Sequence, residues 1–281
     1  MKFIKMHGIG NDYIFVNCFE EHVEEPGKLS VKLSNRHYGI GGDGLILIKP
    51  PKTVGADAKM EIYNADGSRA QMCGNGIRCV AWFIFYYKKL ERDSVYIEAD
   101  DGTVKSVYLK TSGYDIERIT VNMGSPKLST LEIPAIFEKK ERIVGETLKF
   151  NDKEFKVTCV NMGNPHCVIF AEDLFKDETP ERYGKIIENS LEYFPERINV
   201  EFVRPVTRKY CRMRVWERGS GITLACGTGA CAAVVAGVLN GILDREVTVE
   251  LDGGILTINW DEESGDVYMT GDVKKVFVGE I

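Results

Sequence analysis

The sequence predicts an α+β fold made of two similar, sheet-rich halves. Short strand-like runs outnumber the segments with a helical pattern, which favours sheets accompanied by a few helices. A Cys-Gly-x-Gly motif occurs twice, and Gly10-Asn11 and Gly163-Asn164 have the same spacing as its two copies. The chain of 281 residues, with 44% hydrophobic and 28% charged residues, is also long enough for two ordinary globular domains.

The expected strands are short runs, many of which alternate apolar and polar residues as half-buried strands do. They are 45–48, 59–63, 95–98, 103–109, 118–122, 156–160, 167–170, 209–216, 246–251 and 266–269. The expected helices are 28–35, 76–90, 180–189 and 229–243. The last of these is nearly all apolar and too short to span a bilayer, so we expect a buried helix.

An internal repeat divides the chain in two. Cys226, in Ala-Cys-Gly-Thr-Gly, lies 153 residues after Cys73, in Met-Cys-Gly-Asn-Gly, and Asn164 lies 153 residues after Asn11. Two separate pairs at one offset indicate a duplicated unit. We therefore expect an N-terminal half at 1–118 that carries Cys73 and is completed by 272–281, and a C-terminal half at 119–271 that carries Cys226.

Composition excludes several classes of function. With 36 Lys and Arg against 42 Asp and Glu, the net charge is −6, which argues against general nucleic-acid binding and against docking on anionic lipid. The first residues lack the continuous apolar stretch of a signal peptide, so we expect a cytoplasmic protein whose eight cysteines are reduced. With four histidines and no Cys-x-x-Cys pair, we expect no metal site.

The Cys-Gly-x-Gly motif comes directly before an apolar helix in both halves. The glycines permit a tight turn, and the free amide N–H groups at a helix start favour negative charge. We expect a thiol at this place to have a lowered pKa, and the same amides can hold a carboxylate. A lone free cysteine would more simply be a core residue. Two equivalent copies favour a shared chemical role instead.

Two equivalent acid/base groups suit a racemase or an epimerase. One thiolate can remove an α-proton from one face of a carbon while the other thiol delivers a proton to the opposite face. Amides that hold the carboxylate would stabilise the negative charge that develops during the reaction. This chemistry requires no cofactor and no metal, so we expect neither.

Several segments together form a specific signature. They are Met-His-Gly-Ile-Gly-Asn-Asp-Tyr at 6–13, Asn-Ala-Asp-Gly-Ser at 64–68, Met-Cys-Gly-Asn-Gly-Ile-Arg at 72–78, Met-Gly-Asn-Pro-His at 162–166, Phe-Pro-Glu-Arg-Ile-Asn at 194–199, Glu-Arg-Gly at 217–219 and Ala-Cys-Gly-Thr-Gly-Ala at 225–230. In these segments the chain resembles the diaminopimelate epimerases. The resemblance extends to Tyr-Met-Thr-Gly at 268–271, so it covers essentially the whole chain.

The resemblance implies two pseudo-symmetric halves, each a curled, mostly antiparallel sheet around a central helix, with the active site in the cleft between them. It implies a cofactor-independent epimerase that interconverts LL- and meso-2,6-diaminopimelate, for lysine and peptidoglycan precursor synthesis. It also implies a homodimer. Such an enzyme would bind a small-molecule substrate and neither nucleic acid nor membrane.

The resemblance also implies a role for each site residue. Cys73 and Cys226 match the catalytic thiols, and His166 and Glu217 match positions that support them. The residues whose backbone would bind the reacting carboxylate are Gly74, Asn75, Gly227 and Thr228. The residues that would contact the rest of the substrate are Asn11, Asn64, Asn164, Asn199, Glu217 and Arg218. The planar Arg218 side chain can grip a distal carboxylate with two parallel bonds.

Two positions depart from the family pattern, and two other functions stay open. Gly44 stands where many members have a Gln that can touch substrate, so we expect that contact to be absent or made by backbone or water. Ile222 stands where Glu is common, and we interpret it as a local packing variation. A proline racemase or hydroxyproline epimerase would also use two cysteines, although that group usually has His in place of Asn75. A thiol-redox protein could instead oxidise Cys73 and Cys226 to a disulfide.

Overall fold

The computed structural model describes residues 1–70, 72–137, 140–151, 153–170 and 178–281. By its internal contacts the chain divides into two compact units. Unit 1 comprises Met1–Asn122 and Thr270–Ile281, and unit 2 comprises Met123–Met269. Over these described residues each unit is a mixed sheet with two helices, so the predicted α+β class is confirmed.

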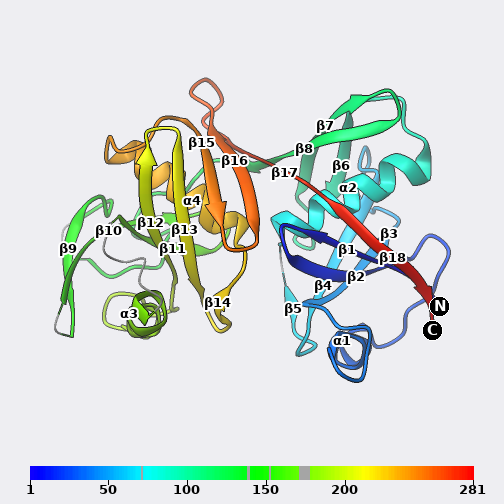
Figure 1. The fold of residues 1–281 in the computed structure, drawn as a ribbon, viewed down its shortest axis with the longest axis horizontal. Helices are drawn as coiled ribbons and strands as arrows, with labels where there is room; N and C mark the ends of the chain where they lie inside the picture. The colour runs from blue at the N-terminus through cyan, green and yellow to red at the C-terminus, as the bar shows by residue number, and fades with distance from the viewer. Residues whose placement is uncertain (71, 138–139, 152, 171–177) are drawn as a thin grey trace. The chain divides into compact units, whose positions relative to one another are not determined.

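Unit 1 is a mostly antiparallel sheet that carries helices α1 and α2 (Figure 1). Its elements are β1 (Lys2–Gly8), β2 (Asn11–Asn17), α1 (Pro26–Ser34), β3 (Gly44–Lys49), β4 (Ala58–Asn64), β5 (Arg69–Ala70), α2 (Gly74–Lys88), β6 (Ser94–Glu98), β7 (Val104–Ser112), most of β8 (Asp115–Gly124) and, from the end of the chain, β18 (Lys274–Glu280). Strand β1 pairs antiparallel with both β2 and β18. The C-terminal strand therefore completes the N-terminal unit.

Apart from its first strand, unit 2 has its elements in the same order as β1 to β8 of unit 1 (Figure 1). They are β9 (Glu146–Phe150), β10 (Lys153–Asn161), β11 (Pro165–Phe170), α3 (Glu178–Glu188), β12 (Asn199–Thr207), β13 (Tyr210–Glu217), β14 (Gly221–Thr223), α4 (Gly227–Leu239), β15 (Glu246–Leu251), β16 (Gly254–Trp260) and most of β17 (Val267–Gly271). Its large core cluster brings together side chains from β9 to β12 and from α3.

The strands pair in the same way in both units. Strands β2 and β3 are parallel, and so are β11 and β12. Strands β4 and β6 are parallel, and so are β13 and β15. Neighbouring pairs such as β3–β4 and β12–β13 are antiparallel. This agreement follows the repeat that the sequence shows, and it lets each residue of one unit be matched to a residue of the other.

A helix after the short hairpin strand is the centre of each unit. Helix α2 contacts β1, β2, β4 and β6, and helix α4 contacts β10, β11, β12, β15 and β16. Buried residues surround α4 on every side, as its apolar sequence Gly-Ala-Cys-Ala-Ala-Val-Val-Ala requires. The predicted buried helix is confirmed. Among the described residues, no helix is both long and apolar enough to cross a membrane.

Candidate active site

Cys73 is the N-cap residue of α2. Its backbone is extended (φ −140°, ψ 107°), and its Sγ accepts a hydrogen bond from the Gly76 N–H at 3.2 Å. A side chain that accepts from the third residue of a helix is a normal N-cap, here made by sulfur instead of oxygen. The thiol is thus held at the positive end of the helix dipole.

Cys226 caps α4 with nearly the same geometry. Its backbone angles are φ −125° and ψ 108°, and its Sγ accepts from the Gly229 N–H at 3.4 Å. The two Cys-Gly-x-Gly motifs therefore build two equivalent thiol-capped helices, one in each unit. Gly74 and Asn75, and likewise Gly227 and Thr228, supply the first-turn amides, which lie before the first intrahelical hydrogen bonds.

The second glycine of each motif leaves room for a strand side chain beneath the helix. A Cβ on Gly76 would lie 2.6 Å from Ile46 Cδ1, and a Cβ on Gly229 would lie 2.6 Å from Glu201 Oε1. A larger residue would force either that side chain or the helix start to move. The glycines are therefore required by close packing between the helix and strand β3 or β12.

Polar side chains from strand and helix surround Cys73. Its Sγ–H donates to Asn11 Oδ1 at 3.2 Å, and Asn75 Nδ2 donates to the same oxygen at 3.3 Å. Arg78 is fully buried and donates through Nη2 to Asn75 Oδ1 at 2.8 Å. Asn11 is fixed further by a 2.7 Å bond from its Nδ2 to Asp43. The structure thus brings the predicted residues Asn11 and Asn75 to this thiol.

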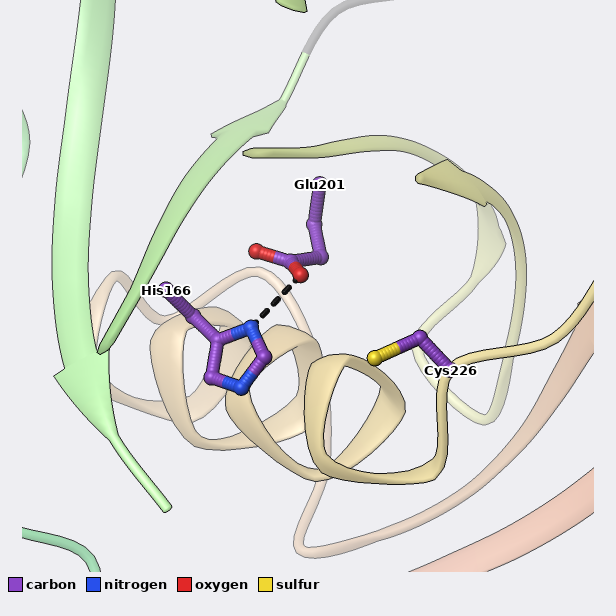
Figure 2. Close-up of side chains that lie close together, drawn as sticks. All are labelled: His166, Glu201 and Cys226. Carbon is purple, nitrogen blue, oxygen red and sulfur yellow. Dashed lines mark hydrogen bonds and ion pairs between the residues drawn. The ribbon is translucent and has the colours of Figure 1, made fainter. Parts of the chain in front are cut away.

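Cys226 lies beside an imidazole and a carboxylate (Figure 2). His166 and Glu201 are fully buried, and His166 Nδ1 lies 2.7 Å from Glu201 Oε1. His166 Nε2 lies 2.9 Å from Asn164 Oδ1, and the Cys226 sulfur lies 3.5 Å from Thr228 Oγ1. One polar atom each from His166, Glu201 and Cys226 lie within 4.8 Å of one another. Because histidine and carboxylate already bond each other, we interpret the group as an acid/base cluster rather than a metal centre.

The predicted lowering of the thiol pKa is wrong. Burial raises the pKa of Cys73 above its ordinary value, although the Gly76 amide and the Tyr13 hydroxyl act in the opposite direction. Burial raises the pKa of Cys226 well above its ordinary value, and the charges of Glu217 and Glu201 raise it further. The physical reason is that a buried thiolate loses hydration, and the helix amides replace only part of it.

Three further predicted residues gather near the end of β13. Asn199 is buried; its Nδ2 donates to the Pro165 carbonyl at 2.7 Å, and its Oδ1 accepts from the Arg218 N–H at 2.9 Å. Glu217 accepts a hydrogen bond from the Thr223 hydroxyl, and its charge acts on Cys226. The Arg218 guanidinium donates to the Glu196 carbonyl at 3.0 Å.

Asn64 is placed in unit 1, at the end of β4. Its side chain donates to Ser68 Oγ at 3.0 Å and is partly buried. In the matching registers Ile46 faces Ile62 and Glu201 faces Val215, so Asn64 and Glu217 occupy corresponding positions. At this corresponding position, unit 1 therefore has an amide and unit 2 has a carboxylate.

The two departures from the family pattern have different environments. A Cβ on Gly44 would lie only 2.2 Å from the Tyr63 carbonyl oxygen, so no side chain fits at this position without a backbone shift. Ile222 is partly exposed in the short strand β14, where it pairs with Trp216. A packing role for Ile222 agrees with this placement.

Sequence reasoning missed Tyr13 and Glu201. Tyr13 lies 153 residues before His166, so the repeat offset could have matched it to that histidine. It is buried beside Cys73. Glu201 lies between the apolar residues Val200 and Phe202, and this pattern indicates a buried charge. The repeat does not predict a site residue there, because the counterpart of Glu201 in the other half is apolar.

The fold is similar to that of several solved proteins. A PhzF-family phenazine biosynthesis protein from Bacillus anthracis has a TM-score of 0.70 at 16% identity, over 100% of this chain and 98% of its own. A probable proline racemase from Agrobacterium radiobacter has a TM-score of 0.71 at 13% identity, over 100% of this chain and 92% of its own. The chain therefore has the fold that these two proteins share.

Sequence similarity narrows this class to one family. The diaminopimelate epimerase family model matches residues 3–129 and 158–276. A diaminopimelate epimerase from Acetivibrio thermocellus is 49% identical, over 100% of this chain and 98% of its own length. The chain belongs to the diaminopimelate epimerase family, and the resemblance found in its sequence is confirmed.

Proposed function

We propose that this chain is a cofactor-independent epimerase that interconverts LL- and meso-2,6-diaminopimelate. The observation that carries the proposal is the matched pair of thiol-capped helices in a member of the diaminopimelate epimerase family. Full-length identity of 49% to a diaminopimelate epimerase supports the substrate, since it extends through both units.

The proposed reaction removes a proton from one face of a single carbon and adds a proton to the opposite face. One cysteine, as thiolate, accepts the α-proton as the C–H bond breaks, and the electron pair spreads into the neighbouring carboxyl group. The other cysteine gives its S–H proton to the opposite face of that carbon and is left as thiolate. Cys73 and Cys226 cap their helices in the same way, which suits such an exchange of roles.

The helix starts and their neighbours supply the binding groups. We assign the reacting carboxylate to the amides of Gly74, Asn75, Gly227 and Thr228, where free N–H groups and the helix dipole favour negative charge. The residues assigned to the remainder of the substrate are Asn11, Asn64, Asn164, Asn199, Glu217 and Arg218. Amides that both donate and accept suit a zwitterion, and Arg218 suits its distal carboxylate.

His166 and Glu217 are assigned to the support of the thiols. Both belong to the surroundings of Cys226 in unit 2.

We further propose that the enzyme is a cytoplasmic homodimer that provides meso-diaminopimelate for lysine and peptidoglycan precursors. Light scattering of the purified chain in solution tests the dimer: a mass of one chain would contradict it.

A substrate comparison tests the proposed function. The purified enzyme is incubated separately with LL-diaminopimelate, L-proline and trans-4-hydroxy-L-proline, and each product is resolved by chiral chromatography. We expect conversion of LL-diaminopimelate alone. Faster conversion of either proline substrate would overturn the proposal in favour of a proline racemase or hydroxyproline epimerase. Activity only after oxidation of the thiols would instead favour a redox protein.

A further inference from the structure

Corresponding positions in the two units hold different chemical groups around the thiol. Strand registers match Tyr13, which faces Gly44, to His166, which faces Asn199. They also match Ile46, which faces Ile62, to Glu201. Packing gives the same match, since Ile46 and Glu201 each lie 2.6 Å from the Cβ position of the second motif glycine. The duplicated fold therefore allows a direct comparison of the two thiols.

Glu201 is costly to bury, and the fold does not require it. Its side chain is 0% exposed, and within the described part of the chain its Oε2 has no hydrogen-bond partner. A buried carboxylate with half of its acceptors unused destabilises a protein. In unit 1 the same place under the helix is filled by the apolar Ile46. The charge of Glu201 must therefore serve something other than packing.

Glu201 does fix the imidazole beside Cys226. Its Oε1 lies 2.7 Å from His166 Nδ1, and this contact fixes the orientation of the ring, with Nε2 toward Asn164. Figure 2 shows the carboxylate above the ring and the Cys226 sulfur to one side of both. In unit 1 the residue at the histidine position is Tyr13, and no carboxylate can hold it from the Ile46 position.

Different charged groups lie beside the two thiols. The groups that face Cys226 are Glu201 from β12, Glu217 from β13, His166 from β11 and the Thr228 hydroxyl from α4. Near Cys73 lies the buried cation Arg78 of α2, whose counterpart 153 residues later is the neutral Cys231. A nearby carboxylate disfavours a thiolate, and a nearby guanidinium favours one.

We propose that Glu201 is a positioning residue that fixes His166 and keeps Cys226 the proton-carrying thiol, while Cys73 ionises first. The inference rests on the proposed function, and it adds the order of ionisation and the residue that sets it. The two thiols are thus unequal before substrate binds: Cys73 is the one prepared to accept a proton and Cys226 the one prepared to donate.

Alkylation against pH tests the order of ionisation without turnover. The protein is treated briefly with iodoacetamide at a series of pH values, and labelling of Cys73 and Cys226 is measured separately by peptide mass spectrometry. Only the thiolate reacts, so each midpoint reports one thiol. We expect the Cys73 midpoint to lie at the lower pH. The reverse order, or equal midpoints, would overturn the proposal, even if the enzyme proved inactive on diaminopimelate.

Glu201→Gln tests the residue itself. Loss of the carboxylate charge should lower the Cys226 midpoint by about 0.5 pH unit or more and leave the Cys73 midpoint unchanged. With LL-diaminopimelate, kcat should fall about 10-fold with little change in KM, because His166 loses its orientation. Loosening of the fold would also hydrate the Cys226 thiol and lower its midpoint, so the Glu201→Asp variant, which keeps the charge, separates the two causes.

Two further variants keep the test decisive. Glu98→Gln removes another buried carboxylate, which accepts backbone bonds at 2.7 Å from Lys52 and Thr53 in unit 1, and should leave both midpoints unchanged. Glu201→Asp keeps the charge and should keep the Cys226 midpoint near its wild-type value. An unchanged Cys226 midpoint in Glu201→Gln would refute the role of Glu201. If Glu201→Gln does not fold, a Cys226 midpoint in Glu201→Asp that is lowered by about 0.5 pH unit or more would refute the role of the charge.

Discussion

Gly76 and Gly229 occupy equivalent places in the two helices but face different atoms. The nearest atom to a Cβ on Gly76 is the terminal methyl of Ile46, which can rotate away. The nearest atom to a Cβ on Gly229 is the Glu201 Oε1, which is held by His166, and the Cys226 sulfur lies only 3.2 Å away. The same substitution should therefore have unequal consequences.

We predict that Gly229→Ala lowers stability by about 1–3 kcal/mol, the usual range for overpacking, and that it also lowers kcat. Gly76→Ala, the matched variant, should cost less because the apolar neighbour can move. Thermal unfolding midpoints of both variants and the wild type provide the comparison. Equal losses of stability would show that the bond between Glu201 and His166 does not restrain the space beneath α4.

At the residue scale the sequence predicted the thiols but not all of their partners. The repeat at one offset identified Cys73, Cys226, Asn11 and Asn164, because these positions hold the same or similar residues in both copies. It could not identify Glu201, whose counterpart is Ile46. The direction of the thiol pKa shift was also beyond sequence reasoning, because it depends on burial by strands distant in the chain.

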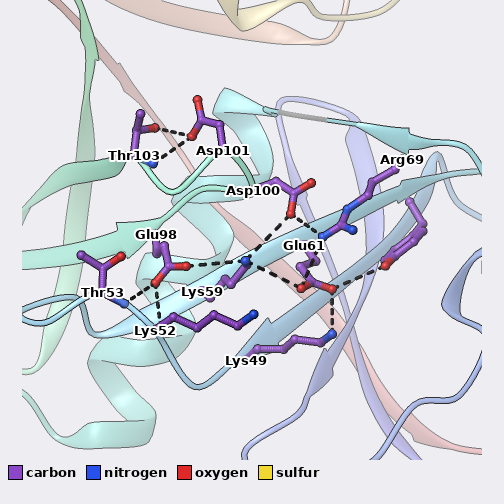
Figure 3. Close-up of polar contacts among 11 residues, drawn as sticks. Lys49, Lys52, Thr53, Lys59, Glu61, Arg69, Glu98, Asp100, Asp101 and Thr103 are labelled. Carbon is purple, nitrogen blue, oxygen red and sulfur yellow. Dashed lines mark hydrogen bonds and ion pairs between the residues drawn. The ribbon is translucent and has the colours of Figure 1, made fainter.

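At the element scale, a polar cluster joins the strands of unit 1 (Figure 3). Glu61 on β4 accepts from Lys49 Nζ on β3 at 2.7 Å and lies 3.4 Å from Arg69 Nη2 on β5. Although burial raises the pKa of Glu61, the Lys49 hydrogen bond and the charges of Lys49, Arg69 and Lys59 outweigh it, and the net shift is downward. Ionised Glu61 therefore stabilises the sheet.

This shift predicts how stability changes in acid. A group whose pKa is lower in the folded chain contributes stability above its unfolded pKa and loses it as pH falls through its folded pKa. Glu61→Gln should therefore be less stable than the wild type at neutral pH, and the difference should shrink below the ordinary glutamate value of 4.5. Urea unfolding midpoints across this range measure the effect. The control is Glu117→Gln, which removes an exposed ion pair to Lys110 and should have little effect at any pH. A difference that persists unchanged into acid would contradict the account of Glu61.

Helices were predicted more completely than strands. All four expected helices are present, with starts about two residues earlier than expected, because the motif glycines and a proline belong to the first turns. Strand β12 was not expected, since its buried run at 199–203 does not alternate and Pro205 follows closely. Strands β5 and β14, with two and three residues, are too short for any periodicity to be seen.

At the scale of the whole molecule, duplication explains both the similarity and the difference between the units. Parallel pairing occurs at the same two places in each sheet, and the same N-cap holds each sulfur. Around this common frame, unit 1 supplies Tyr13 and Arg78, while unit 2 supplies His166 and Glu201. A single stereocentre that loses a proton on one face and gains one on the other suits two similar sites with unequal neighbours.

The most direct test of the two-thiol reaction replaces each cysteine in turn. Epimerisation of LL-diaminopimelate is measured by chiral chromatography for Cys73→Ala and Cys226→Ala, with circular dichroism as the check of folding. Loss of the sulfur cap should cost each helix about 1 kcal/mol, which a folded chain tolerates. We predict that neither variant epimerises the substrate although both are folded. Near-normal turnover by either folded variant would contradict the account, because one thiol would then suffice.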